Sequence, residues 1–254
     1  MTTNSPRTAL VTGANKGIGR AIASRLGEQG LCVYLGARDE SRGRQTEREL
    51  RADGLDARFV QLDVTDESSV ARAAKHIEAD AGRLDSLVNN AGIGGPVGPP
   101  SRTAVGEVRR TYETNVFGVI AVINAMLPLL RRSAAARIVN VSSLLGSLTH
   151  AAAQEDPSGV FPAGAFPAVL DYNTSKAALN ALTVTYANEL RAEGILVNSV
   201  SPGFVATDIN GHRGHLTPEQ GARLPALLAT CCDDGPTASF FGEDGSPAGQ
   251  PLAW

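Results

Sequence analysis

Short apolar runs alternate along the chain with longer amphipathic stretches. The runs are rich in Val, Ile and Leu without strict alternation, which is typical of strands covered on both faces. They are Thr8–Thr12, Leu31–Ala37, Arg58–Val64, Ser86–Asn89, Arg137–Val141, Ile195–Val200 and a weaker Ser239–Phe241. Helical periodicity fills the intervals at Ile18–Gln29, Ser41–Ala52, Ser68–Ala79, Val105–Leu130, Thr174–Ala192 and Pro218–Ala229. This alternation predicts an α/β fold, a doubly wound parallel sheet with helices on both faces.

The same pattern predicts one domain over residues 1–254, because no change of composition divides the chain. Residues 149–168 are rich in Gly, Pro and Ala, and we expect them to form a loop or an irregular insertion. We expect residues 208–230 to cover the substrate as a lid. The tail, 243–254, is rich in turn-forming residues, and Trp254 is expected to anchor it by packing.

Composition narrows the classes of partner. The net charge of −3 offers no basic surface for nucleic acid or an anionic membrane. No apolar run reaches the roughly 20 residues that span a bilayer, and residues 1–7 contain no signal-peptide core. We therefore expect a cytoplasmic protein that binds neither nucleic acid nor membrane.

Neither a disulfide nor a metal site is expected. Cys231 and Cys232 are adjacent, which is a poor geometry for a bridge, and Cys32 lies inside an apolar run. His212 and His215 lie in a predicted loop, and no set of acidic or cysteine ligands stands near them in the sequence.

A glycine-rich turn follows the first predicted strand and leads into the first helix. Its glycines let the backbone turn tightly and approach a pyrophosphate, whose charge is favoured at a helix N-terminus. The glycine spacing differs from G-x-G-x-x-G, but the position between strand and helix is the context that such a motif requires. We predict a dinucleotide site here, with contacts from Gly13, Asn15, Lys16, Gly17, Ile18 and Gly19.

The residues after the second strand favour NADP(H) over NAD. An NAD site usually places a carboxylate at the end of this strand to bind the ribose hydroxyls. Ala37 occupies that position and Arg38 follows, so Arg38 and Lys16 can neutralise a 2′-phosphate. Asp39 is the competing ribose ligand. We interpret it as lying near the N-cap of the next helix, with Ser41 as the other candidate cap.

Other strand ends offer further cofactor contacts, because ligands bind at the carboxyl ends of the strands in such sheets. Asp63 and Val64 end the third run, and Asp63 can accept from an adenine amino group or simply cap the strand. The fourth run ends at Asn89, and the small residues Ala91 and Gly92 permit close packing against the cofactor. A turn after the sixth run can reach the nicotinamide with Pro202, Gly203, Val205 and Thr207.

The chemistry is predicted from a tyrosine and a lysine four positions apart, on one face of a helix. A tyrosine with a pKa of about 10 is a poor acid or base at neutral pH. The ammonium of Lys176 beside Tyr172 would favour the phenolate, and it can also bind the nicotinamide ribose. Ser143 closely follows the fifth run, where its hydroxyl can orient a carbonyl oxygen. Asn115 inside a predicted helix indicates a paired side chain or a local distortion.

Together these motifs resemble those of the short-chain dehydrogenase/reductase family. Within it, the glycine turn and the residues around Arg38 are similar to those of the NADPH-dependent carbonyl reductases, over residues 8–208 and more loosely beyond. The resemblance implies a single-domain Rossmann fold of about seven strands. It also implies Tyr172 as proton donor, Lys176 lowering its pKa, Ser143 holding the carbonyl and Asn115 ordering a water relay to Lys176.

One departure from most family members lies between Ser143 and Tyr172, which are 29 positions apart, further than usual. The extra length is the predicted insertion, which is again similar to the carbonyl reductases. In those relatives the insertion covers a helix face that other members use to oligomerise, so a monomer is expected, although an oligomer stays open. We also expect the insertion to line the substrate pocket.

The sequence therefore predicts NADPH-dependent reduction of a ketone or aldehyde. The insertion and the lid carry few charges, which favours a hydrophobic or aromatic substrate. One alternative is an NAD-linked alcohol dehydrogenase. Another is a nucleotide-binding regulator without catalysis, which would not need Ser143, Tyr172 and Lys176 together. An extended epimerase or dehydratase would need more than the roughly 50 residues that follow Pro202.

Overall fold

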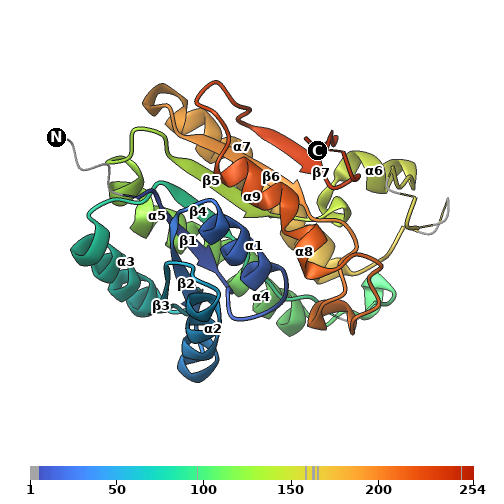
Figure 1. Cartoon of the computed structure of the whole chain (residues 1–254). Coiled ribbons are helices and arrows are strands. Elements are labelled where there is room, and N and C mark those ends of the chain that lie inside the picture. Colours follow the sequence, from blue (N-terminus) through green and yellow to red (C-terminus); the bar gives the residue numbers. More distant parts are fainter. Residues whose placement is uncertain (1–5, 96, 158, 162–163, 165, 247) are drawn as a thin grey trace.

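One sheet runs through the centre of the protein (Figure 1). The computed structural model describes all residues except 1–5, 96, 158, 162, 163, 165 and 247. The strands are β1 (Thr8–Thr12), β2 (Cys32–Ala37), β3 (Ala57–Gln61), β4 (Ser86–Asn89), β5 (Arg137–Val141), β6 (Leu196–Ser201), β7 (Ser239–Gly242) and β8 (Gln250–Pro251). Their order is β3-β2-β1-β4-β5-β6-β7-β8.

The first seven strands are parallel, which confirms the predicted doubly wound sheet. The eighth strand is an addition to the seven expected. It comes from the tail and pairs antiparallel with β7. Two residues are too few to produce a periodicity in the sequence, so no hydrophobic pattern predicts this strand.

Helices cover both faces of the sheet. They are α1 (Gly17–Glu28), α2 (Glu40–Ala52), α3 (Glu67–Ala81), α4 (Val105–Tyr112), α5 (Gly118–Leu130), α6 (Leu148–Ala153), α7 (Leu170–Leu190), α8 (Pro218–Gly221) and α9 (Arg223–Ala229). Leu10 of β1 packs into a core with α3, α5 and α7, whereas its neighbours Ala9 and Val11 pack into a second core with α1, α2 and α9. This division follows from the alternation of side chains along a strand. In Figure 1, α1, α8 and α9 lie in front of the sheet.

The helix predicted at Val105–Leu130 is interrupted. A turn of π-helix, η2 (Glu113–Phe117), separates α4 from α5. Among the residues that the structure describes, this is the one span with the length and apolar composition of a membrane helix, with a mean hydropathy of 1.6. More than half of its apolar window, 56%, is buried, and α5 packs against α3 and β4. Packing inside the domain therefore accounts for its apolar character.

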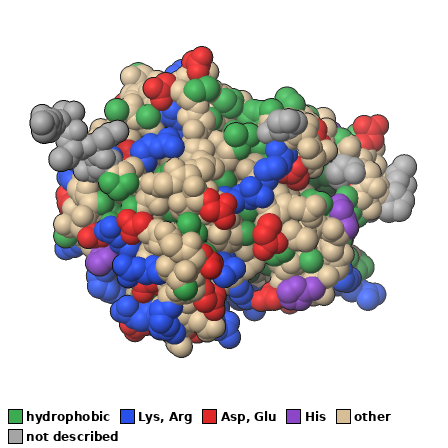
Figure 2. Space-filling view, viewed as in Figure 1, with side chains coloured by type: hydrophobic (Ala, Val, Ile, Leu, Met, Phe, Trp, Pro, Cys, Tyr) green, Lys and Arg blue, Asp and Glu red, His purple; other side chains and the backbone are tan. Residues whose placement is uncertain are grey.

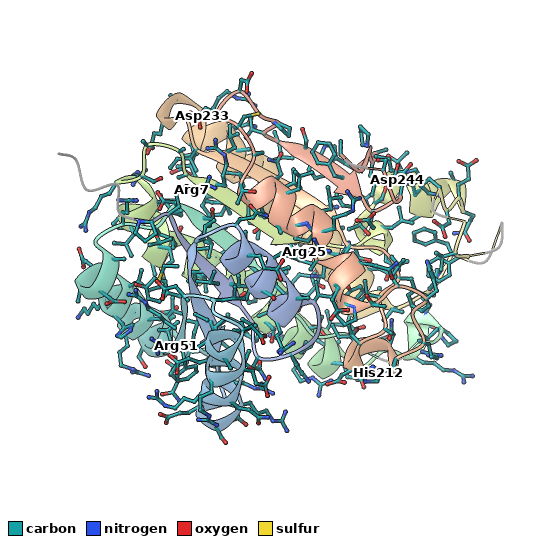
Figure 3. The ribbon with its side chains drawn as sticks, in the orientation of Figure 1. Arg7, Arg25, Arg51, His212, Asp233 and Asp244 are labelled. Carbon is teal, nitrogen blue, oxygen red and sulfur yellow. The ribbon has the colours of Figure 1, made fainter. Side chains whose placement is uncertain are left out.

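The helix predicted at Pro218–Ala229 forms as two short helices, α8 and α9, that pack against the body of the domain. Leu224, Ala226 and Leu228 of α9 are buried in the core with α1, and α8 and α9 both contact α1. Figure 3 labels Arg25 of α1, which donates to the backbone carbonyl of Glu219 in α8. Of the expected lid, residues 208–230, only the loop at residues 208–216 stays a candidate cover, and its role stays a prediction.

The predicted insertion contains a short helix, α6, that the sequence did not predict. Residues 158, 162, 163 and 165 of the insertion, and residue 247 of the tail, lie outside the described residues. The tail packs against the rest of the domain as expected. The ring of Trp254 stacks on Phe240 with 5.6 Å between ring centroids and an angle of 19° between the planes.

Candidate functional site: a dinucleotide groove beside an apolar pocket

The glycine turn lies at the carboxyl end of β1. Gly13 and Gly17 have φ values of +66° and +54°, in the left-handed region that favours glycine. A Cβ at Gly19 would lie 2.4 Å from the carbonyl oxygen of Gly13, so α1 begins directly against the turn. The residue before α1, Lys16, forms no side-chain capping bond. The first N–H groups of α1 therefore lack a side-chain partner, which suits a pyrophosphate.

A groove of about 940 Å³ extends from this turn across the strand ends. Three predicted contacts are not in its lining. Gly203 and Val205 line a neighbouring pocket. Asn89 is buried, and its Nδ2 donates to Oδ1 of Asn140 at 2.8 Å. The predicted residues that do line the groove are Gly13, Asn15, Lys16, Gly17, Ile18, Gly19, Arg38, Asp63, Val64, Ala91, Gly92, Tyr172, Lys176, Pro202 and Thr207.

The two cations predicted for a 2′-phosphate have different surroundings. Arg38 is exposed on the groove, and its guanidinium has no partner among the described residues. Lys16 instead forms an ion pair with Asp208, from the loop on the opposite side of the groove. The hydrogen bond and charge of Lys16, with His212, hold the pKa of Asp208 below its usual range. Lys16 still lines the groove, so its expected contact with a 2′-phosphate beside Arg38 stays a prediction.

Asp39 is the N-cap of α2. Its Oδ1 accepts from the backbone N–H of Arg42 at 3.0 Å. This confirms the cap interpretation, since the carboxylate is engaged by its own helix instead of standing free for a ribose. Figure 2 shows Lys and Arg side chains gathered around this helix, mixed with acidic side chains. Arg44, for example, pairs with Glu40 one turn away.

The carboxylate of Asp63 is tied to its own turn. Its Oδ1 accepts from the backbone N–H and the Oγ1 of Thr65, at 3.0 and 2.7 Å. The strand β3 ends at Gln61, earlier than predicted, so Asp63 and Val64 belong to the turn beyond it. Asp63 thus takes the capping role, and it also faces the groove, where an adenine could lie.

The Tyr172 and Lys176 side chains meet at the junction of the groove and the neighbouring pocket. Both belong to the start of α7, and the Nζ of Lys176 lies 5.5 Å from the centroid of the Tyr172 ring. Tyr172 lines both cavities and is hydrogen-bonded to the side chain of Ser143. Lys176 is 4% exposed, and its Nζ donates to the backbone carbonyl of Val141 at 2.7 Å. The structure thus brings together three of the four predicted catalytic residues.

Burial controls the protonation of this pair. Desolvation raises the pKa of Tyr172 to about 12, and the hydrogen bond to Ser143 acts in the opposite direction. Desolvation also lowers the pKa of Lys176 to about 8. The expected net lowering of the Tyr172 pKa by Lys176 is therefore wrong in this structure. The physical reason is the loss of water around the phenol, while the Nζ of Lys176 donates to the carbonyl of Val141.

Asn115, the fourth predicted residue, lies in the π-helical turn and is fully buried. Its Oδ1 accepts from the N–H of Ile93 at 2.9 Å, and its Nδ2 donates to the carbonyl of Ile93 at 2.8 Å and to Oγ of Ser175 at 3.0 Å. Both alternatives suggested by the sequence, a paired side chain and a distorted helix, are therefore realised. A Cβ at Gly92 would lie 3.4 Å from Oδ1 of Asn115 and 3.6 Å from Nζ of Lys176. Gly92 thus keeps the space between these two side chains open.

An apolar pocket of about 620 Å³ adjoins the groove. Ser143 and Tyr172 supply polar groups where the two cavities meet. Val160 and Phe161 of the insertion are in its wall, and the expectation that this is the substrate pocket stays a prediction. The Phe161 ring lies 6.0 Å from that of Phe204. Other apolar lining residues are Ile18, Val97, Leu144, Leu145, Val169, Val205, Ile209 and Leu252.

The loop at residues 206–216 borders both cavities. A bridge between Val205 and Leu216 closes its base. There the N–H of Ala206 donates to the carbonyl of Leu216 at 2.9 Å, and the N–H of Leu216 donates to the carbonyl of Phe204 at 3.1 Å. His212, labelled in Figure 3, bonds to Asp208 at 2.8 Å. No group of three or more His, Cys, Asp or Glu side chains that could hold a metal occurs within the described part of the chain.

The sequence predicts that Asn89 and Asn90 tie neighbouring strand ends together. Nδ2 of Asn90 does so, since it donates to the carbonyls of Thr12 and Gly13 at 2.9 and 3.3 Å and shapes the glycine turn. Sequence reasoning missed the pairing of Asp208, and no local signal could have identified it, because its partner Lys16 is 192 positions away.

Comparison with known proteins identifies the family. A sequence model described as short chain dehydrogenase matches residues 7–154 and 161–216, with a break inside the predicted insertion. The chain is 37% identical to short-chain dehydrogenase/reductase 1 of Saponaria officinalis, over 92% of this chain and 93% of that one. It is 33% identical to carbonyl reductase (NADPH) 1 of Homo sapiens, over 92% and 95% of the two chains.

A solved structure supports the same family. Carbonyl reductase from chicken fatty liver, crystallised with NADPH bound, matches with a TM-score of 0.82 and 26% identity, over 98% of this chain and 99% of that one. The chain therefore belongs to the short-chain dehydrogenase/reductase family.

Proposed function

We propose that this protein is an NADPH-dependent reductase of apolar ketones or aldehydes. The observation that carries the proposal is the position of Tyr172. Its phenol stands between the dinucleotide groove and the apolar pocket and is hydrogen-bonded to Ser143. Membership of the family, and relatives named as NADPH carbonyl reductases, support an NADP-dependent oxidoreductase that acts on carbonyl or alcohol groups.

The residues of the groove fit NADP(H). The uncapped start of α1 and the left-handed glycines suit the pyrophosphate. The free guanidinium of Arg38 suits the 2′-phosphate, and Asp39 is engaged by α2. The buried ammonium of Lys176 at the far end suits the nicotinamide ribose. When bound there, NADPH supplies the hydride.

The protein's own residues supply the proton. In our proposal the Ser143 hydroxyl binds and orients the carbonyl oxygen of the substrate. Tyr172 then gives its phenolic proton to that oxygen, which yields the alcohol. A pKa raised to about 12 keeps Tyr172 protonated in the resting protein. Lys176, still mainly charged below its pKa of about 8, stabilises the phenolate left behind.

Asn115 has a positioning role in this scheme. Its three hydrogen bonds hold Ile93 and Ser175, and so fix the backbone after β4 against α7 near Lys176. The open space at Gly92 between Asn115 and Lys176 is where we propose that water reprotonates the site. The apolar lining of the pocket supports a hydrophobic or aromatic substrate. A monomer in the cytoplasm stays a prediction, and analytical ultracentrifugation would test the monomeric state.

The experiment is a panel of aromatic and aliphatic ketones, aldehydes and quinones. Initial rates are followed by NADPH absorbance and repeated with NADH. We expect turnover of apolar carbonyl compounds with a clear preference for NADPH. Preference for NADH, with faster oxidation of the matching alcohols, would favour an NAD-linked alcohol dehydrogenase. Tight NADPH binding with no turnover of any compound would favour a regulator without catalysis.

A further inference from the structure

The segment at residues 250–254 is held against the body of the domain at four places. It enters through β8, which pairs with β7 beyond the turn that contains Asp244, labelled in Figure 3. The N–H of Leu252 donates to the carbonyl of Phe240 at 2.8 Å. The ring of Trp254 stacks on Phe240. The fourth place is the start of the insertion.

The bonds to the insertion come from two hydroxyl residues. Oγ of Ser147 donates to the carbonyl of Ala253 at 2.8 Å. The N–H and the Oγ1 of Thr149 both donate to the carbonyl of Trp254, at 2.9 and 2.8 Å. The residues in these two side-chain bonds are 106 and 105 positions apart in the sequence. The start of the insertion and the tail therefore form one joined structure.

This joined structure forms part of the wall of the apolar pocket. Gln250 and Leu252 of the tail line the pocket together with Val160 and Phe161 of the insertion. Leu252 is close to the sheet, because a Cβ at Gly242 would lie only 2.9 Å from its Cδ1. Leu252 therefore cannot retreat toward β7 when a substrate enters.

Val160, Gln250 and Leu252 of this wall lie outside the match to the family's sequence model, whereas Phe161 lies inside it. The match omits residues 155–160 and ends at residue 216. In contrast, the groove residues of the glycine turn and the catalytic residues all lie within it. The proposed chemistry is therefore located in the part of the chain that the family's sequence model matches, and the wall at residues 250–254 lies outside that match.

We propose that residues 250–254 form a wall of the substrate pocket that determines substrate specificity. Within this wall, Leu252 limits the size of the substituent that an apolar carbonyl substrate can carry. Ser147 and Thr149 hold the wall in position. The proposal rests on the proposed function, because it takes the apolar pocket as the substrate site.

The test uses two substitutions with opposite effects on the space in the pocket. Leu252→Ala removes volume from the wall and Leu252→Phe adds it. Each variant is assayed by NADPH absorbance with aryl alkyl ketones whose alkyl chain lengthens one carbon at a time. We expect the chain length at which kcat/KM falls to become longer in Leu252→Ala and shorter in Leu252→Phe. One methylene in a hydrophobic pocket is worth about tenfold or more in selectivity, so the ratio of long to short substrates should change by at least that factor.

Leu148→Ala is the matched control. Leu148 lies on α6, is 70% exposed and does not line the pocket. Its profile should coincide with that of the unmodified protein. Thr149 is tested as a residue that positions the wall. Thr149→Val should weaken the selectivity for chain length through KM, with little change in kcat. Thr149→Ser keeps the hydroxyl and should retain the selectivity of the unmodified protein.

A binding measurement separates this proposal from the proposed function. Trp254 is the only tryptophan of the chain and stacks on Phe240, two residues along the chain from Leu252. We use its fluorescence to measure ketone binding without NADPH. If the Kd profile shifts with residue 252 but no ketone is reduced, the wall is supported and the reductase proposal fails. If ketones are reduced but neither the Kd nor the kcat/KM profile shifts in either Leu252 variant, the wall proposal is overturned.

Discussion

Lys176 reaches from α7 to the end of β5, where its Nζ donates to the backbone carbonyl of Val141 at 2.7 Å. This bond fixes the ammonium in a buried position, 5.5 Å from the centre of the Tyr172 ring. Burial lowers the pKa of Lys176 to about 8. The charge that we propose to stabilise the Tyr172 phenolate is therefore lost within the pH range of an ordinary assay.

The first prediction is a fall in reduction at alkaline pH. Below a pKa of about 8 Lys176 is charged, and above it the side chain becomes neutral, whereas the pKa of Tyr172 lies at about 12. We expect kcat/KM for ketone reduction to decline as the pH rises through about 8. Lys176→Arg keeps a cation at all these pH values, so its residual activity should lack this decline. The same decline in the arginine variant would show that another group is responsible.

The second prediction concerns the proton donor. Tyr172→Phe removes the phenolic proton and keeps the ring, so kcat should fall by about 10²- to 10⁴-fold, the usual contribution of acid–base catalysis. NADPH binding, measured by the fluorescence of the reduced nicotinamide, should be retained. A variant that still reduces ketones at a comparable rate would require another proton source.

The third prediction separates the two cations near the groove. Arg38→Gln should raise KM for NADPH about tenfold to a hundredfold and leave NADH little changed, because charge-assisted hydrogen bonds contribute roughly 1.5–3 kcal/mol. Lys16→Gln should have a smaller effect on this preference, since Lys16 is paired with Asp208. Arg44→Gln, which removes an exposed ion pair on α2, is the control. An unchanged preference in Arg38→Gln would contradict the assignment of the 2′-phosphate site.

The fourth prediction tests the packing that places Lys176. A Cβ at Gly146 would lie 2.7 Å from the backbone carbon and the Cβ of Lys176. Gly146→Ala should therefore displace α7. We expect it to lower kcat and to lower the free energy of unfolding by about 1–3 kcal/mol. Gly106→Ala, in α4 where a Cβ meets nothing within 4 Å, should instead stabilise the protein by up to about 1 kcal/mol. Urea unfolding and initial rates of both variants make the comparison.

The sequence alone was sufficient for the local parts of this site. Apolar runs predicted the seven parallel strands, because strands buried on both faces must be apolar whatever surrounds them. The helical spacing of Tyr172 and Lys176 predicted their common face, and the low helix propensity of Asn115 indicated the interruption now seen as η2. Each of these follows from constraints that act within a few residues along the chain.

Tertiary structure alone decided which distant groups meet and how much water they keep. It paired Lys16 with Asp208, and it placed Leu252 in the wall of the pocket. It also reversed the expected shift of the Tyr172 pKa. A pKa depends on desolvation by every element packed around the group, and a pairing over 192 positions depends on the whole path of the chain. Neither is encoded in a local pattern of residues.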